Sequence, residues 1–251
     1  MKLFYSPYAL GTNQMTENGH ETLVAASDIE SRLSGKMELR STESIGTALT
    51  KIKAGDIIQL APDTWTYNGS IVIDKPCTII GHPGATVIKR GSGLGVGPLL
   101  SITSDNVYLQ GITFLDDTET DQIDCIKIDS GTDESLVQIL NCRILNFKVG
   151  ISAVAGGSTI FAFNEIRVSS IGIKITGDSH NNCINSNFIK VKPEGTHGIL
   201  LESEVAFTTV CGNISGKKIT FQNTGSAQTF SSPGGSFNHV SGNVATLEEK
   251  T

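Results

Sequence analysis

The chain has 251 residues, of which 38% are hydrophobic and 18% are charged, and its formal net charge is −6. This length suits one domain with a sizeable core, and the acidic balance provides no basic surface for nucleic acids or anionic membranes, so neither is an expected partner. Glycine is abundant, with 27 residues, and hydrophobicity is spread evenly, which is typical of many short strands joined by turns.

Residues 1–40 form an N-terminal arm that does not share the periodic pattern found later in the chain. Its first apolar residues are Phe4, Tyr5, Tyr8 and Leu10, and aromatic side chains of this kind anchor protein interfaces. A segment that cannot fold alone must dock on something. The arm therefore either packs along its own domain or reaches a neighbouring subunit or another protein, and these four residues are our candidate partner-binding residues.

The N-terminus lacks the apolar stretch of a signal peptide, and no later run is long enough to span a membrane. The five cysteines are odd in number and show neither CxxC spacing nor pairing with histidine, which disfavours a disulfide framework and a zinc site. We expect them to be small core residues of a protein that folds in a reducing cytoplasm, with no cofactor. They are Cys77, Cys125, Cys142, Cys183 and Cys211.

Residues 41–52 are predicted to form a short capping helix, because Ile45, Ala48, Leu49 and Ile52 follow helical spacing and serines precede them as possible N-caps. Short β-branched segments come next. The ordered motifs are Gly-Asp-Ile-Ile-Gln-Leu, then Trp-Thr-Tyr, then Ser-Ile-Val-Ile, then Lys-Pro-Cys-Thr-Ile-Ile-Gly, which span residues 55–81. This order resembles the opening coils of the pectate-lyase-like parallel β-helix superfamily.

The resemblance covers residues 41–215 and implies a fold. The superfamily contains polysaccharide lyases, glycosidases, periplasmic copper-site proteins and many phage virion proteins, so function must be argued from a site.

Two marks recur at the length of one coil between residues 107 and 215. One is an isoleucine after a small residue, at Cys125-Ile126, Gly150-Ile151, Gly172-Ile173 and Gly198-Ile199. The other is an asparagine that leads an apolar segment, at Asn141, Asn164, Asn187 and Asn213. Two residue series that repeat with the same period are typical of a solenoid. In the segments between them, apolar and polar residues alternate as they do in β-strands.

A leucine-rich repeat has a similar period, but this chain has neither a leucine consensus nor a helical half-repeat. We therefore predict an all-β protein, a right-handed single-stranded parallel β-helix of about seven coils at about 4.8 Å per coil. The isoleucines should stack inside the helix, and the asparagines should take the left-handed corner conformation and bond in a ladder. Glycine before each isoleucine should let the backbone bend at the next corner.

The densest acidic stretch contains Asp116, Asp117, Glu119, Asp121 and Asp124. In pectate-lyase relatives, acidic residues on one outer face bind calcium and a basic residue removes a proton beside a uronate carboxylate. Here the acids are predicted to lie in a solvated loop, and the only arginines that we place within the coils are Arg143 and Arg167. We therefore assign no catalytic residue and no metal ligand.

A second comparison is with polygalacturonase-like glycosidases, which combine an Asp-Asp pair, Gly-His-Gly and Arg-x-Lys. Asp116-Asp117 and Thr196-His197-Gly198 match the first two, and the third is missing. Three to four coils separate the matching parts, or about 15 Å, whereas glycoside hydrolysis needs about 5 to 10 Å between its two acids. We therefore reject that site.

The sequence thus predicts an arm (1–40), a β-helix with its capping helix (41–215) and a terminal coil with an irregular tail (216–251). The resemblance and the arm favour a non-enzymatic bacteriophage virion protein that folds in the host cytoplasm. We expect a trimeric capsid decoration or cement protein on the capsid surface, whose partners are its own copies and the major capsid protein. The alternative is a tailspike or fibre that binds or cleaves host polysaccharide, as a lyase or glycosidase.

Overall fold

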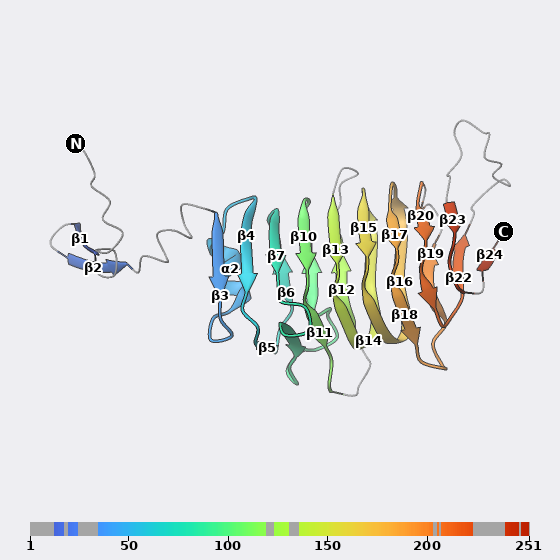
Figure 1. The fold of residues 1–251 in the computed structure, drawn as a ribbon, viewed down its shortest axis with the longest axis horizontal. Coiled ribbons are helices and arrows are strands. Elements are labelled where there is room, and N and C mark those ends of the chain that lie inside the picture. Colours follow the sequence, from blue (N-terminus) through green and yellow to red (C-terminus); the bar gives the residue numbers. More distant parts are fainter. Residues whose placement is uncertain are drawn as a thin grey trace.

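The computed structural model describes residues 13–17, 20–24, 35–118, 123–130, 136–202, 205, 207–222, 239–245 and 247–250. It is a parallel β-solenoid of about seven turns, and its strands follow one another along the long axis of the molecule (Figure 1). The predicted all-β parallel β-helix is confirmed. In the described part of the chain, no helix is long and apolar enough to cross a membrane.

Two parallel sheets and a small hairpin make up the structure. The nine-stranded sheet contains, in spatial order, β23 (His239–Ser241), β20 (Thr209–Cys211), β17 (Cys183–Asn185), β15 (Thr159–Ala162), β13 (Val137–Leu140), β10 (Val107–Gln110), β7 (Cys77–Ile80), β4 (Asp56–Leu60) and β3 (Lys36–Leu39). The strands β1 (Asn13–Glu17) and β2 (His20–Val24) pair antiparallel as a separate sheet.

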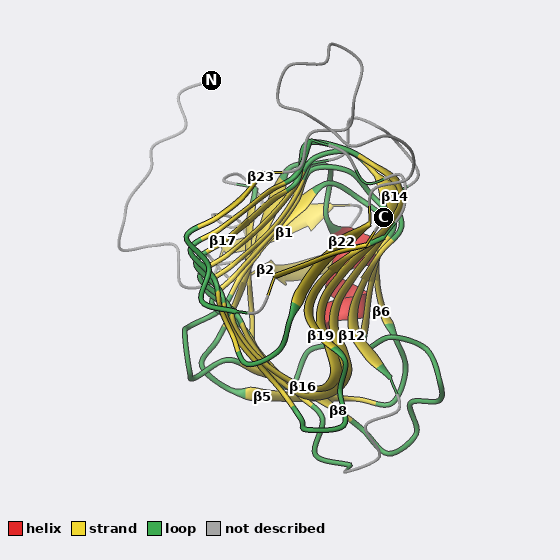
Figure 2. Cartoon of the chain, turned by 90° about the vertical axis from the view of Figure 1, so that its right-hand side faces the viewer, coloured by secondary structure: helices red, strands yellow, loops and turns green. Residues whose placement is uncertain are grey.

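The thirteen-stranded sheet continues around the rest of each coil (Figure 2). Its main path contains β24 (Leu247–Lys250), β22 (Ile219–Gln222), β19 (His197–Leu201), β16 (Glu165–Ser179), β14 (Arg143–Gly156), β11 (Thr113–Leu115), β8 (Val87–Arg90) and β5 (Thr64–Tyr67). Shorter strands complete it: β6 (Ile71–Ile73), β9 (Leu100–Ile102), β12 (Asp124–Ile128), β18 (Phe188–Val191) and β21 (Ile214–Ser215).

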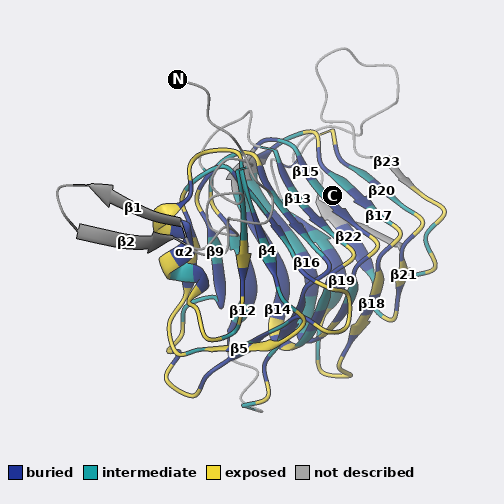
Figure 3. Ribbon diagram, turned by 60° about the vertical axis from the view of Figure 1, so that its left-hand side comes forward, coloured by how far each residue is buried: buried dark blue, intermediate teal, exposed yellow. Residues whose placement is uncertain are grey.

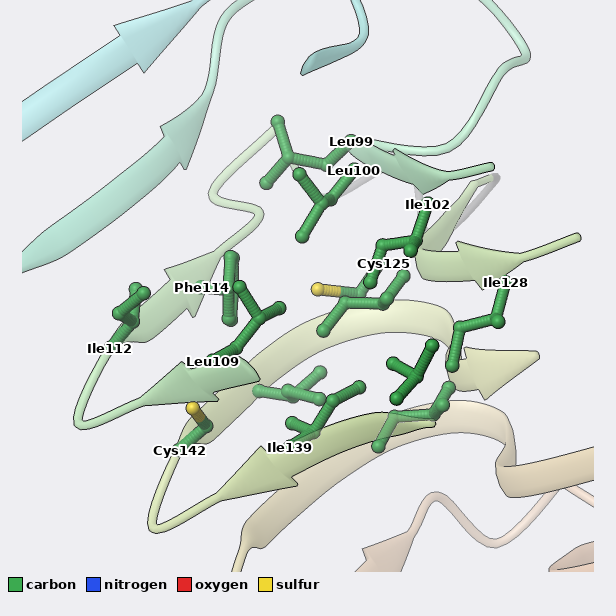
Figure 4. Packing of buried hydrophobic residues seen from close by; sticks show 14 of the residues in the cluster. Leu99, Leu100, Ile102, Leu109, Ile112, Phe114, Cys125, Ile128, Ile139 and Cys142 are labelled. Carbon is green, nitrogen blue, oxygen red and sulfur yellow. The ribbon is translucent and has the colours of Figure 1, made fainter. Parts of the chain in front are cut away.

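The core consists of columns of apolar side chains that stack from coil to coil, as Figure 4 shows for Leu109, Ile139 and their neighbours. The predicted isoleucine series is one such column. Its four members, Ile126, Ile151, Ile173 and Ile199, stand in register and are fully buried. Each buried side chain of this size stabilises the fold by about 1.5 to 3 kcal/mol, so the repeat builds the core directly.

The glycines before these isoleucines have a different role from the predicted one. A Cβ atom on Gly150 would lie 2.5 Å from the carbonyl oxygen of Gly172, and one on Gly172 would lie 2.4 Å from that of Gly198. None of the three has a left-handed backbone. Glycine is therefore required here for close approach between coils and not for a bend.

The asparagine ladder forms, but one coil later than predicted. It runs through Asn164, Asn187, Asn213 and Asn243, and each Nδ2 group donates to the next Oδ1 atom at 3.0, 2.9 and 2.9 Å. Asn141 is exposed, and the backbone N–H of Cys142 donates to Asn164 Oδ1 in its place, at 2.9 Å. The predicted ladder was wrong for Asn141 and missed Asn243. The predicted left-handed conformation is confirmed for Asn141 but was wrong for Asn164, Asn187 and Asn213.

The left-handed corner and the ladder are adjacent positions, which explains the error. The corner column contains Asn141, Phe163, Ser186 and Gly212, with φ angles of 51°, 58°, 53° and 64°. In each of the four coils with a ladder asparagine, that asparagine directly follows the left-handed corner residue, which is Gly242 in the last of them. Asn141 occupies the corner position, so its side chain cannot also enter the ladder.

The capping helix is confirmed as α2 (Ile45–Lys51), with Ser44 as its N-cap. Ile45, Ala48, Leu49 and Ile52 are all buried, and Figure 3 shows the opposite side of the helix exposed. At its other end, Lys75 Nζ donates to the carbonyl oxygens of the last turn at 3.1 to 3.3 Å. The helix thus closes the first coil.

All five cysteines are free thiols, but they are not all core residues. Cys77, Cys125 and Cys142 are buried as expected, and burial raises the pKa of Cys142 to about 12. Cys183 and Cys211 are half-exposed. Their positions on β17 and β20 alternate with the inward Ile184 and Val210, so for these two the prediction was wrong.

Candidate functional site

The candidate partner-binding residues Phe4, Tyr5, Tyr8 and Leu10 lie outside the described residues, as do Glu119 and Asp121 of the acidic stretch. The remaining acids of that stretch, Asp116, Asp117 and Asp124, are described and occupy three different environments.

Asp116 is not a solvated loop residue. It is 1% exposed, and its Oδ2 atom lies 2.8 Å from Nη1 of Arg90, itself only 7% exposed. Arg90 Nη2 also donates to the carbonyl oxygen of Leu94 at 3.1 Å, and the N–H of Thr118 donates to Asp116 Oδ1 at 2.9 Å. Arg90 on β8 thus contacts both the segment after β8, through Leu94, and the segment after β11, through Asp116. The carboxylate of Asp116 therefore has a structural role.

Arg90 also lies within the coils, on β8, so the prediction that only Arg143 and Arg167 do so was wrong. The separation of 26 residues between Arg90 and Asp116 is one coil, and that spacing was the available signal. Asp117, the next residue, is exposed and pairs with Lys89 at 2.5 Å.

Asp124 is a strand residue and begins β12. Burial raises the pKa of its carboxyl group, and the ammonium groups of Lys148, Lys174 and Lys127 oppose that rise. Lys127 is in register with Ser152, and Ser152 with Lys174. A half-buried acid among three lysines is an arrangement that can transfer a proton or hold an anionic group.

Two of these lysines already have acidic partners. Lys127 Nζ lies 3.3 Å from Asp129 Oδ2, and Lys174 Nζ lies 2.9 Å from Glu202 Oε1. The cluster is therefore nearly neutral as a whole. Within the described ranges, no group of three or more His, Cys, Asp and Glu residues is arranged to hold a metal ion.

His197 stands in the same register column as Asp124, with Val149 and Ile171 between them. Three strand spacings separate the two residues, or about 14 Å. The distance is too long for both side chains to act on one glycosidic bond, so the structure does not bring His197 to either Asp116 or Asp124.

Seven neighbouring strands of the nine-stranded sheet, β4 to β20, carry no charged side chain in their two outward columns, whereas the next strand, β3, places Lys36 and Glu38 in the same columns. From β4 to β20, each strand points two side chains outward, and we call this surface the uncharged face. One column contains Ile57, Thr78, Tyr108, Gln138, Ile160, Cys183 and Thr209. The other contains Gln59, Ile80, Gln110, Leu140, Ala162, Asn185 and Cys211.

The charged side chains of the same coils lie on the thirteen-stranded sheet instead. Glu165, for example, pairs with Arg143 at 2.7 Å and with Arg167 at 2.5 Å. The hydrogen bond from Arg143 lowers the pKa of the Glu165 carboxyl group, and the charges of both arginines add to that effect. Charge is therefore segregated between the two sheets of one coil.

A short apolar column lies across the corner that carries the asparagine ladder, in register with Glu165 of the preceding coil. Phe188, Ile214 and Val244 stack in register there and are 46%, 50% and 67% exposed. We call them the apolar column. Like the uncharged face, it runs parallel to the axis of the solenoid, because both follow register from coil to coil.

Neither a protein-family model nor a curated protein sequence matches the chain. Among solved structures, an alginate lyase from a Paenibacillus species superposes with a TM-score of 0.61 and 17% identity, over 84% of this chain and 76% of that one. The catalytic domain of a GH87 α-1,3-glucanase superposes with a TM-score of 0.59 and 16% identity, over 85% of this chain. The chain spans only 45% of that domain.

A protein of Geobacillus virus E2, ORF18, superposes more loosely, with a TM-score of 0.43 and 11% identity. The two better superpositions establish the fold alone, because identities this low do not carry a reaction from one chain to another. The resemblance inferred from the opening motif is confirmed at the level of the fold, and that fold is shared with enzymes that act on polysaccharides.

Proposed function

We propose that this chain is a non-enzymatic structural protein of a bacteriophage virion, a trimeric capsid decoration protein that clamps neighbouring capsid subunits. The observation that carries the proposal is the uncharged face. A flat surface without charge across seven strands has the composition of an interface centre, where charged residues are depleted. The short acidic β-helix and the aromatic arm support the assignment to a virion.

The positions of the uncharged face and the apolar column support self-association. The uncharged face and the apolar column flank one corner and run parallel to the axis, so three parallel copies can pack with each face against the next copy's column. Over the three coils of the apolar column such a contact buries no charge and avoids the desolvation penalty that a buried ion imposes. In the preceding coils the same register column continues into Glu165 and Arg143, whose ion pair would lie at the edge of the contact.

The test is the native mass of the purified chain, measured by light scattering over a range of concentrations. We expect a trimer. Ile160→Lys should dissociate it, because the substitution places an ammonium group in the middle of the uncharged face. The matched control is Val72→Lys, an exposed β-branched residue of β6 on the other sheet, which should leave the mass unchanged. A wild-type chain that stays monomeric at all concentrations would exclude the proposal.

A second candidate function rests on Asp124. A half-buried acid among three lysines suits a chain that acts on or binds an acidic host polysaccharide, and the fold is compatible with such activity. The test is the release of unsaturated products or reducing ends from uronate polymers. If activity is present and Asp124→Asn abolishes it while the native mass is retained, this second function replaces the first.

A further inference from the structure

Two phenylalanines occupy corner positions that suit other residues better. Phe163 has a φ angle of 58° and Phe207 one of 50°, both in the left-handed region. A bulky aromatic residue rarely adopts this conformation, which glycine and asparagine tolerate. The neighbours of Phe163 in its corner column are Asn141, Ser186 and Gly212. The backbone conformation at positions 163 and 207 therefore does not explain why phenylalanine occupies them.

Both aromatic side chains are also exposed, by 63% for Phe163 and 48% for Phe207. The ring of Phe207 stacks on that of His180, with 6.4 Å between their centroids. In the isolated chain each phenylalanine thus combines backbone strain with apolar surface in water. Strain of this kind persists where a function requires it, and an exposed aromatic residue is a typical interface anchor.

Their place in the fold connects them to the uncharged face. Phe163 directly follows β15, and Phe207 lies two residues before β20, so they stand at opposite ends of the strands of the nine-stranded sheet. The corner with Phe163 is the one between the strands labelled β17 and those labelled β16 in Figure 2. The uncharged face therefore has an exposed aromatic residue at each of two edges.

We propose that Phe163 and Phe207 are the anchor residues through which the uncharged face docks on a second copy of this chain. The inference rests on the proposed function, since it names the residues and the partner of the same surface. A second copy of the chain can meet the uncharged face without bringing like charges together, although the chain as a whole is acidic. The formal net charge is −6, so two copies repel each other generally, and an uncharged face brings no like charges together.

The available area agrees with this assignment. Seven strands of about four residues form a face of roughly 34 by 13 Å, or about 440 Å². Each phenylalanine exposes about half of its surface and adds about 100 Å². With an equal area covered on the neighbour, a contact buries about 1,280 Å², just above the lower limit of about 1,200 Å² for a stable interface. Without the two phenylalanines it buries about 880 Å² and falls below that limit.

The experiment combines Phe163→Asn and Phe207→Asn in one variant and measures both association and monomer stability. Asparagine suits the left-handed conformation, so the thermal midpoint, measured at a dilution where all variants are monomeric, should stay unchanged or rise. The dissociation constant of the assembly should rise at least tenfold. The control Ser186→Asn, at the same corner position one coil away, should change neither the association nor the fold.

A second measurement uses the wild-type chain alone. Cys183 and Cys211 lie on the uncharged face, so alkylation by iodoacetamide should be at least tenfold slower in the assembly than in the diluted monomer. If the wild type assembles but the double variant assembles equally well, or the two thiols react at one rate in both states, the inference is overturned while the proposed function stands. If the wild type does not assemble at all, both are overturned.

Discussion

At the scale of single residues, this solenoid depends on positions where neighbouring coils nearly touch. Gly150 and Gly172 admit no Cβ atom, because the next coil's backbone occupies that space. The ladder asparagines use the same proximity, since the amide of Asn187 bonds both to the coil before it and to the coil after it. One repeated residue therefore acts on two coils.

Asn187→Ala should destabilise the fold by about 3 kcal/mol, because it leaves several buried groups without partners. Its Nδ2 group donates to the carbonyl oxygen of Phe161 at 2.8 Å, and its Oδ1 atom accepts from the backbone and side-chain amides of Asn164. Urea unfolding checks this. The control is Asn185→Ala, an outward residue of β17, which should change stability by less than about 1 kcal/mol. Equal losses would contradict a special role for the ladder.

Asp124→Asn should stabilise the protein at neutral pH. The folded carboxyl group has a raised pKa, so the folded state binds its proton more tightly and loses stability as pH rises from the unfolded pKa, about 3.9, through the folded pKa. The gain from the neutral amide should therefore disappear as pH falls toward about 4. Thermal unfolding from pH 3.5 to 7.5 measures it, with exposed Asp74→Asn as the control. A gain that is equal at all pH values would refute the assigned cause.

At the scale of elements, α2 and the first coil stabilise each other. The helix buries Ile45, Ala48 and Leu49 against the open end of the core, and the hydroxyl oxygen of Tyr67 accepts a hydrogen bond from the N–H of Ile45 at 2.6 Å. At the other end, Lys75 from the β6–β7 connection satisfies the last carbonyl groups. A seven-residue helix needs such support, because helices this short are unstable alone.

Lys75→Met keeps the aliphatic part of the side chain and removes the ammonium group. We expect a loss of about 1 kcal/mol, the usual effect of a cation at a helix C-terminus. Lys51→Met is the control, because Lys51 lies in the same last turn and is exposed. Chemical denaturation compares the two variants. A loss as large in Lys51→Met would mean that general charge, and not the capping contact, is responsible.

At the scale of the whole molecule, the distribution of charge separates the two sheets. The ion pairs of Glu165 with Arg143 and Arg167 lie on the thirteen-stranded sheet, whereas the uncharged face covers strands β4 to β20 of the nine-stranded one. The charged thirteen-stranded sheet is therefore suited to contact with solvent, and the uncharged face is suited to contact with a neighbouring copy of the chain. This separation supports the view that assembly is the function of the chain.

Deletion of residues 1–34 tests the role of the arm. The cut ends before β3, the first strand of the nine-stranded sheet, so the solenoid should remain folded and trimeric by circular dichroism and light scattering. Binding to capsids that lack the protein should be lost, because Phe4, Tyr5 and Tyr8 of the arm are the residues that we propose as its aromatic anchors. Cosedimentation with such capsids measures it. Undiminished binding would place the capsid contact on the solenoid.

The sequence by itself determined the parallel β-helix, the capping helix and the buried isoleucine column, because these depend on side-chain periodicity and on spacing along the chain. It did not determine the pairing of Arg90 with Asp116, the start of the ladder at Asn164 or the outward positions of Cys183 and Cys211. Those depend on the register between coils, and a shift of one residue changes a corner into a ladder position or an inward side chain into an outward one. The uncharged face emerged only from the tertiary structure, since its fourteen residues lie in seven separate segments that stacking alone brings together.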